Sequence, residues 1–247
     1  MDRSLYVAMT GAMQTLNAQA ANSHNLANAS TVGFRAELVN TQAAPIAGSG
    51  LPSRVNSIAQ SDGWDSTPGT IMTTGRDLDI ALRGDNWLAV QAADGSEAYT
   101  RAGDLQLTPA GQVLTGAGHP VLADSGALAV PPNTGMTIGN DGTISVIAQG
   151  QGPATLAQVG RLKVMSIAPQ NLERGLDGLM RLKPGADAQP AAGLTITSGA
   201  LESSNVNPAE AMVNMIQLAR QFELETKLMK TADDNGQASS SILRAAG

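Results

Sequence analysis

The side chains of this sequence that could do acid, base or metal chemistry are few. Asp77, Asp79 and Asp85 lie in one short stretch, and carboxylates gathered in this way can ligate a hard cation. Asp77 and Asp79 would share one face of a strand, whereas Asp85 follows a glycine and lies on a turn. A solvated strand face therefore explains these aspartates better than a metal site does.

Other kinds of active site are poorly supplied. The chain has no cysteine and two histidines, His24 and His119, which excludes disulfides, thiolate nucleophiles and cysteine-bound metals. Neither histidine stands in a recognisable nucleophile motif. A formal net charge of −6 speaks against a nucleic-acid partner, which requires a basic surface. We therefore expect no catalytic residue, no bound metal and no cofactor.

The first element that would position functional residues is a helix at the N-terminus. Residues 3–29 contain no proline, and one row of residues steps alternately by four and three, which indicates a coiled-coil-like seam. The row consists of Leu5, Met9, Ala12, Leu16, Gln19, Ser23 and Leu26. No stretch of the chain approaches the roughly 18 apolar residues that a membrane span needs, so no membrane insertion is expected.

A second long helix is predicted over about 208–243. Asn207 is a suitable N-cap, and Pro208 fits the first turn. The same alternation returns in a row made of Met212, Met215, Ala219, Phe222, Thr226, Met229, Asp233, Gly236, Ser240 and Leu243. Polar residues in both rows make the pair weak. Apolar residues outside the rows, such as Ile216 and Leu228, indicate helices that pack against several neighbours in an assembly.

The segments between the helices have another texture. Residues 36–75 contain Pro45, Gly48-Ser49-Gly50 and Pro52 and are predicted to be an extended linker. Residues 76–200 show short strands with turn signals every 8–12 residues, which predicts an antiparallel β domain. Hairpin turns are expected at Asp94-Gly95, at 109–111 and at 139–142. The predicted fold is therefore α+β, in which the helices of 1–35 and 201–247 pair as one α domain.

Three blocks of sequence resemble the bacterial flagellar rod and hook family. The first is Asn25-Leu26-Ala27-Asn28 followed by Thr31-Val32-Gly33-Phe34-Arg35; the second combines 74–85 with Tyr99-Thr100-Arg101-Ala102-Gly103; the third is 201–207. They occur in the family's order and bracket nearly the whole chain. His24 stands where the family usually has Asn, and Arg35 stands where Lys is common.

The first block also has a physical interpretation of its own. Asn25 and Asn28 lie three residues apart near a helix end, where amides cap backbone groups. Gly33 permits a positive φ and Phe34 would anchor the turn in an apolar site. The block is thus a helix-ending loop or, as we favour, a device that fixes the exit of a helix belonging to a shared bundle.

The resemblance implies a structural subunit of the flagellar basal-body rod, of the proximal-rod type, with the distal-rod type as the alternative. Other rod proteins, copies of the chain and the flagellar type III export apparatus would be its partners, and it would reach the periplasm-spanning rod without a cleaved signal peptide. A peptidoglycan-acting enzyme and a secreted β-rich binding protein are weaker alternatives. The expected assembly interface comprises Leu5, Met9, Leu16, Asn25, Leu26, Asn28, Gly33, Phe34, Asn205, Asn207, Met212, Met215, Ile216, Phe222 and Met229.

Overall fold

The contacts of the chain divide it into two compact units. The computed structural model describes residues 3–45, 55–150 and 156–245. Unit 1 combines residues 1–29, 36–65 and 206–247, and unit 2 combines residues 30–35 and 66–205. Each unit thus joins segments that are far apart in the sequence.

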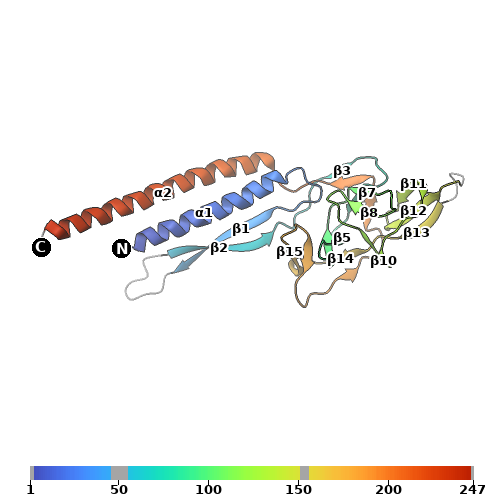
Figure 1. Cartoon of the computed structure of the whole chain (residues 1–247), viewed down its shortest axis with the longest axis horizontal. Helices are drawn as coiled ribbons and strands as arrows, with labels where there is room; N and C mark the ends of the chain where they lie inside the picture. Colours follow the sequence, from blue (N-terminus) through green and yellow to red (C-terminus); the bar gives the residue numbers. More distant parts are fainter. Residues whose placement is uncertain (1–2, 46–54, 151–155, 246–247) are drawn as a thin grey trace. The chain divides into compact units, whose positions relative to one another are not determined.

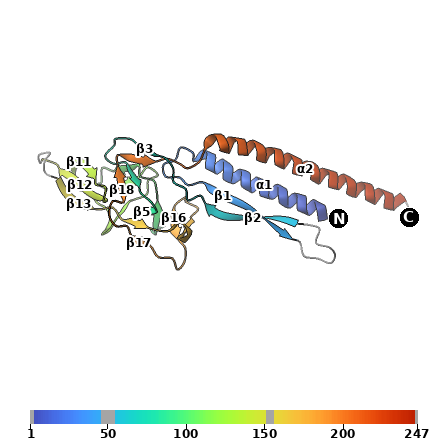
Figure 2. The ribbon, with the colours of Figure 1, turned by 180° about the vertical axis from the view of Figure 1, so that it is seen from behind.

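Unit 1 is built on the two terminal helices. Helix α1 (Arg3–Ala27) and helix α2 (Pro208–Ala245) lie side by side, and α1 also packs on strands β1 (Glu37–Pro45) and β2 (Val55–Trp64) (Figures 1 and 2). The Asn207 side-chain oxygen accepts from the N–H groups of Ala209 and Glu210 at 3.1 and 3.4 Å. The predicted pairing of the helices and the predicted N-cap are both confirmed.

The segment expected to be a linker contains two paired strands instead. Strand β1 pairs antiparallel with β2 from Glu37 opposite Trp64 to Pro45 opposite Val55. The sequence does not signal this pairing because the strands lack a clear alternation of apolar and polar residues, although both strands lie against α1. The glycines and Pro52 that suggested a linker lie in residues 46–54, outside the described residues.

The helix seam differs in register from the predicted rows. On α2 the half-buried row includes Met215, Phe222 and Met229 as expected, but it continues through Ala211, Leu218, Glu225 and Ala232. The other residues of the predicted row, at positions 212, 219, 226 and 233, are exposed. On α1 the buried side chains include Ala12 and Thr15, whereas Met9 and Leu16 are 46% and 47% exposed. A row chosen by apolar residues alone misses a seam made of small and polar ones.

Unit 2 is the β domain, and every strand pair described in it is antiparallel. Its largest sheet has six strands in the order β15-β16-β6-β5-β14-β17. The strands are β3 (Ile71–Thr73), β4 (Ile80–Leu82), β5 (Asn86–Gln91), β6 (Glu97–Thr100), β7 (Leu105–Leu107), β8 (Val113–Thr115), β9 (Leu122–Ala123), β10 (Gly126–Ala127), β11 (Asn133–Ile138), β12 (Thr143–Ala148), β13 (Leu156–Arg161), β14 (Val164–Ser166), β15 (Leu172–Arg174), β16 (Met180–Leu182), β17 (Gln189–Pro190), β18 (Ile196–Ser198) and β19 (Ala200–Glu202), with a 3₁₀ turn at Pro169–Asn171.

The three predicted hairpins are confirmed. Strands β5 and β6 pair across the Asp94-Gly95 turn, β7 pairs with β8, and β11 pairs with β12. Their inward side chains form one apolar core that includes Leu88, Val90, Leu105 and Ile144.

The ends of unit 2 extend beyond the predicted 76–200. Strand β18 pairs with β4, and β19 pairs with β3, so the segment up to residue 205 completes the β domain. Residues 30–35 also belong to unit 2, although the turn motif was expected in the α domain. The physical reason is a set of buried charges that these segments share.

Candidate functional site

Glu202, at the end of β19, is a carboxylate buried between two guanidinium groups. Its side chain is 1% exposed. Its Oε1 lies 2.6 Å from Nη2 of Arg35, and its Oε2 accepts from Nε of Arg101 at 2.6 Å. Arg35 and Arg101 are 4% and 3% exposed. We call these three residues the Glu202 network.

Backbone carbonyls compensate the second positive charge of the network. Arg101 donates to the carbonyl oxygens of Leu82, Gly84 and Asn86 at 2.7, 2.8 and 2.8 Å. Its guanidinium also lies 5.6 Å from the centre of the Trp87 ring, within the range of a cation–π contact. A buried charge is tolerated only when it is paired and hydrogen-bonded, and Arg101 meets this condition by clamping the turn between β4 and β5.

Besides Arg35, which is part of the network, Gly33 of the first motif block also contacts a network residue. Its N–H donates to the backbone carbonyl of Glu202 at 2.8 Å, and its φ is +67°. A Cβ at this position would lie 2.4 Å from the carbonyl carbon of Arg101. The expected positive φ is confirmed, and the close approach of a second backbone adds a further reason for glycine.

Phe34 anchors the turn as expected. It is 8% exposed, and the Arg174 guanidinium lies 4.5 Å from the centre of its ring. Arg174 also donates to the Arg35 carbonyl at 3.1 Å. The Phe34 carbonyl accepts from the N–H of Asn205 at 3.2 Å. Two of the expected interface residues, Phe34 and Asn205, therefore make contacts within unit 2.

The segment that enters unit 2 at residue 66 is fixed by the same network. The Gly69 N–H donates to Oε1 of Glu202 at 3.0 Å, and the Thr70 N–H donates to the Ser203 hydroxyl at 3.0 Å. The Thr67 carbonyl accepts from the Asn205 side chain at 3.1 Å and also from Arg35. Arg35, Arg101 and Glu202 each lie in a different motif block. The sequence marked the blocks but gave no sign that these three charges meet.

The remaining predicted amides act within unit 1. The Asn25 side chain donates to the Glu37 carbonyl at 2.9 Å and accepts from the Glu37 N–H at 2.8 Å, so it takes the place of a neighbouring strand. Asn28 donates to the His24 carbonyl at 2.9 Å, and His24 Nδ1 lies 3.4 Å from Glu37. These contacts fix the end of α1 and the start of β1.

The contact between α1 and α2 has a polar centre. The Thr15 hydroxyl donates to both carboxylate oxygens of Glu225 at 3.1 and 3.0 Å. A Cβ on Gly11 would lie 3.2 Å from Oε1 of Glu225, so the glycine leaves room for the carboxylate. Asn22 donates to the Ala211 carbonyl at 2.7 Å. Thr15 contacts Glu225, and Asn22, later in α1, contacts Ala211, earlier in α2. The two helices therefore run antiparallel.

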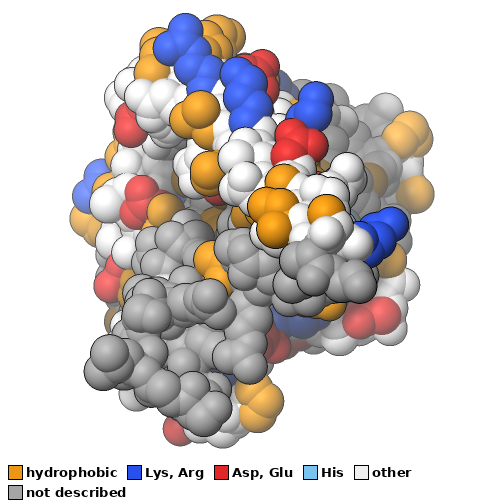
Figure 3. Space-filling model, turned by 90° about the vertical axis from the view of Figure 1, so that its left-hand side faces the viewer, with side chains coloured by type: hydrophobic (Ala, Val, Ile, Leu, Met, Phe, Trp, Pro, Cys, Tyr) orange, Lys and Arg blue, Asp and Glu red, His pale blue; other side chains and the backbone are white. Residues whose placement is uncertain are grey.

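Apolar side chains remain exposed on both helices. On α1 they step by three and four through Tyr6, Met9, Met13 and Leu16, and on α2 by multiples of four through Met212, Ile216, Leu224 and Leu228; all eight are at least 46% exposed. We call these rows the α1 stripe and the α2 stripe. In the view from the side on which the helix ends lie, hydrophobic side chains stand exposed among charged ones (Figure 3). Met9, Leu16, Met212 and Ile216 of the expected interface belong to these stripes, whereas Leu5, Leu26, Met215, Phe222 and Met229 are half-buried.

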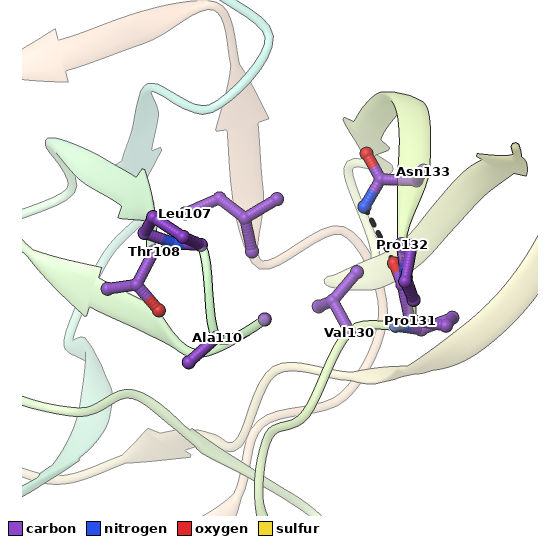
Figure 4. Close-up of a pocket in the computed structure, with 9 residues that line it drawn as sticks. Leu107, Thr108, Ala110, Val130, Pro131, Pro132 and Asn133 are labelled. Atoms are coloured by element: carbon purple, nitrogen blue, oxygen red, sulfur yellow. Dashed lines mark hydrogen bonds between the residues drawn. The ribbon is translucent and has the colours of Figure 1, made fainter.

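A surface hollow of unit 2 has no catalytic character. It lies between the β7–β8 turn and residues 130–133 and has a volume of about 260 Å³ (Figure 4). Its lining consists of Leu107, Thr108, Pro109, Ala110, Gly111, Val130, Pro131, Pro132 and Asn133. None of these side chains titrates, so the hollow offers neither an acid nor a base.

The described residues contain no group of three His, Asp or Glu side chains that could hold a metal ion. Asp79 is nevertheless not solvated as expected: it is 1% exposed and accepts from the Thr74 hydroxyl at 2.6 Å.

Burial, followed by the nearby charge of Glu97, raises the pKa of Tyr99. Among the described helices, none combines the length and the apolar character that crossing a membrane requires.

The chain has paired terminal helices, a β domain inserted between them in the sequence, and three motif blocks joined by one buried network. These features define a subunit of the flagellar rod and hook class. Three family descriptions match the chain: "Flagella basal body rod protein" at residues 5–35, "Flagellar hook protein FlgE/F/G D1 domain" at 81–146 and "Flagellar basal body rod FlgEFG protein C-terminal" at 197–242.

Comparison with named relatives shows which member of this class the chain resembles. The chain is 47% identical to the flagellar basal-body rod protein FlgF of Escherichia coli, over 98% of this chain and 99% of the relative. It is 48% identical to FlgF of Salmonella typhimurium, over 95% and 96%. The identity to FlgG of Buchnera aphidicola is 33%, over 93% and 95%. The chain belongs to the flagellar basal-body rod proteins of the FlgF type, which are structural subunits of the rod and not enzymes.

Proposed function

We propose that this chain is a subunit of the proximal rod that assembles through its terminal helices with copies of itself and with other rod proteins. The observation that carries the proposal is the pair of exposed apolar stripes on α1 and α2. Exposed apolar rows of this kind mark surfaces that become buried in an assembly. Contacts between unlike faces of neighbouring copies would leave the array open along its axis, as a rod requires.

The mechanical role follows from this arrangement. The rod subunit joins basal structures to the distal rod and transmits torque, and many shared helix contacts carry the load. The chain reaches the rod through the flagellar type III export apparatus without a cleaved signal peptide. A distal-rod role is the alternative, and the higher identity to FlgF than to FlgG favours the proximal role.

An in-frame chromosomal deletion, followed by electron microscopy of purified basal bodies, tests the proposal. We expect basal bodies that stop before the rod is complete and carry no hook. An arrest beyond the proximal rod would favour the distal role. Normal hooks and filaments would contradict a role in the rod.

A point variant tests the part played by the helices. Ile216→Asp places a charge in the α2 stripe, where Ile216 is 57% exposed, and should abolish hooks because an unpaired charge would be buried in the assembly. Gln217→Asp adds the same charge at the next exposed position and should assemble normally. Equal assembly of both variants would exclude the α2 stripe as an interface.

A further inference from the structure

The Glu202 network lies where the chain enters and leaves unit 2. The chain passes between the units at residues 29–30, 35–36, 65–66 and 205–206. On the unit 2 side, these segments end at Arg35, at Thr67 to Thr70 and at Asn205. Arg35 and Gly69 are bonded to Glu202 itself, and the Asn205 side chain donates to the Thr67 carbonyl, which also accepts from Arg35.

The two carboxylate oxygens of Glu202 have different partners. Oε1 pairs with the Arg35 guanidinium and accepts from the N–H of Gly69; these two residues belong to two of the connecting segments. Oε2 accepts from Arg101, which itself donates to carbonyls at the end of β4 and the start of β5. Strand β5 is an inner strand of the six-stranded sheet. One side chain thus links the connecting segments to the centre of the β domain.

We propose that Glu202 is the mechanical anchor of unit 2. This inference rests on the proposed function, in which the rod subunit transmits torque. A pull along any of the connecting segments reaches the same carboxylate and passes through Arg101 to the sheet. Charge-assisted hydrogen bonds are the strong class of hydrogen bond, and several of them converge here in a dry site, so they share the load.

The anchor predicts a variant that fails under load. Glu202→Gln keeps the shape of the side chain but removes the charge that both guanidinium groups require. Glu97→Gln serves as the matched control, because Glu97 pairs with Lys163 at 2.7 Å in the same unit but is a third exposed. The gene for each variant replaces the wild-type gene in a flagellated strain, and rotation of the flagella is followed at low load and in a viscous medium.

We expect Glu202→Gln cells to rotate at low load and to lose rods in the viscous medium. The breakage rate should rise by at least about tenfold over wild type, which a loss of about 1.4 kcal/mol from the barrier already produces. Glu97→Gln cells should break at the wild-type rate. Equal breakage of Glu202→Gln and wild-type rods under high load would overturn the anchor.

Hydrogen exchange on the purified full chain tests the same inference without assembly. In Glu202→Gln, the amides of Gly33 and Gly69 should exchange at least about tenfold faster, whereas the core amide of Val90 should be unchanged. Wild-type exchange at both glycines would overturn the proposal. If Glu202→Gln does not fold, Asn205→Ala removes the side-chain bonds to Thr67, whose carbonyl also accepts from Arg35. This variant should show the smaller effect at high load, and wild-type behaviour of it would count against the anchor.

The two levels of the proposal fail separately. Normal rods in the deletion strain would remove the proposed function itself. Rods that require the chain, but that resist load equally with Glu202 and with Gln at this position, would remove only the anchor.

Discussion

The hydroxyl of Thr15 donates to the carboxylate of Glu225, a residue 210 positions later in the chain, at 3.0 and 3.1 Å. The contact joins the first helix to the last at the centre of their seam. A carboxylate at a seam position costs stability relative to an apolar residue but fixes one register. The polar pair therefore sets how the two ends of the chain align.

Thr15→Val tests this alignment. The substitution keeps the shape of the side chain and removes the donor, so unfolding of unit 1 should require about 1 kcal/mol less. Thr10→Val is the control, because the Thr10 hydroxyl bonds only the Tyr6 carbonyl of its own helix. Chemical unfolding followed by the helical circular dichroism signal measures both. An equal loss at the two positions would contradict a special role for the Thr15–Glu225 pair.

Gly33→Ala should destabilise unit 2 more than Gly75→Ala. Both glycines have a similar positive φ, +67° and +73°, so both substitutions carry a conformational penalty of about 1 kcal/mol. The new methyl group would meet the Arg101 backbone at position 33, whereas nothing lies within 4 Å of it at position 75. Overpacking should add about 1–3 kcal/mol at Gly33.

The fluorescence of Trp87, which is buried in unit 2, reports this unfolding in a Trp64→Phe background. Similar unfolding midpoints for the two alanine variants would show that the backbone around Arg101 can move aside.

The sequence predicts the helices and hairpins because their signals are local. The Asn207 cap, the Asp94-Gly95 turn and the positive φ of Gly33 each depend on a few neighbouring residues. The β1–β2 pairing escapes prediction because the strands lack an alternating pattern of their own, and the helix α1 that lies against them is distant in the sequence from β2. Tertiary packing commonly overrides local propensity in this way.

The candidate site is predicted in part for a similar reason. Gly33, Phe34 and Asn205 lie in recognisable motifs, but the pairing of Arg35 and Arg101 with Glu202 is a long-range contact that no spacing reveals. The predicted row on α2 misses part of the observed seam, because Ala211 and Glu225 are residue types that a row of large apolar side chains does not select. Their burial follows from Asn22 and Thr15 on the other helix.

The Asp177–Arg181 pair should make unit 2 sensitive to acid. The Arg181 side chain donates to both carboxylate oxygens at 2.7 Å, and these bonds hold the pKa of Asp177 below its ordinary value. A carboxyl whose pKa is lower in the folded state stabilises the protein above its ordinary pKa, and this contribution is lost as the pH falls through the folded-state pKa.

Asp177→Asn should therefore cost about 0.5–1 kcal/mol at neutral pH, a value reduced because the pair is about a third exposed. The cost should be smaller at pH 2 than at neutral pH, because the contribution of the pair declines as the pH falls through the folded-state pKa. Asp187→Asn removes the same charge at an exposed position and serves as the control in urea unfolding. A cost for Asp177→Asn that is equal at both pH values would contradict the linkage.

The far end of α2 should be the least stable part of the isolated subunit. Because the helices are antiparallel and Thr15 faces Glu225, α2 continues beyond the first residues of α1 (Figure 1). This part contains Asp233-Asp234-Asn235-Gly236 and Ser239-Ser240-Ser241, which are poor helix formers. A helical segment with neither a packed face nor high propensity is marginal in water.

In hydrogen exchange on the monomer, amides after about residue 234 should exchange close to the rate of an unfolded peptide, whereas those of 215–229 stay protected. Gly236→Ala should slow exchange in this part by favouring the helix by about 1 kcal/mol. Ala238→Gly, two residues further on, should have the opposite effect and serves as its counterpart. Assembly should protect the whole of α2, because neighbouring copies supply the contacts that α1 does not reach. Equal protection along α2 in the monomer would show that the helix is complete before assembly.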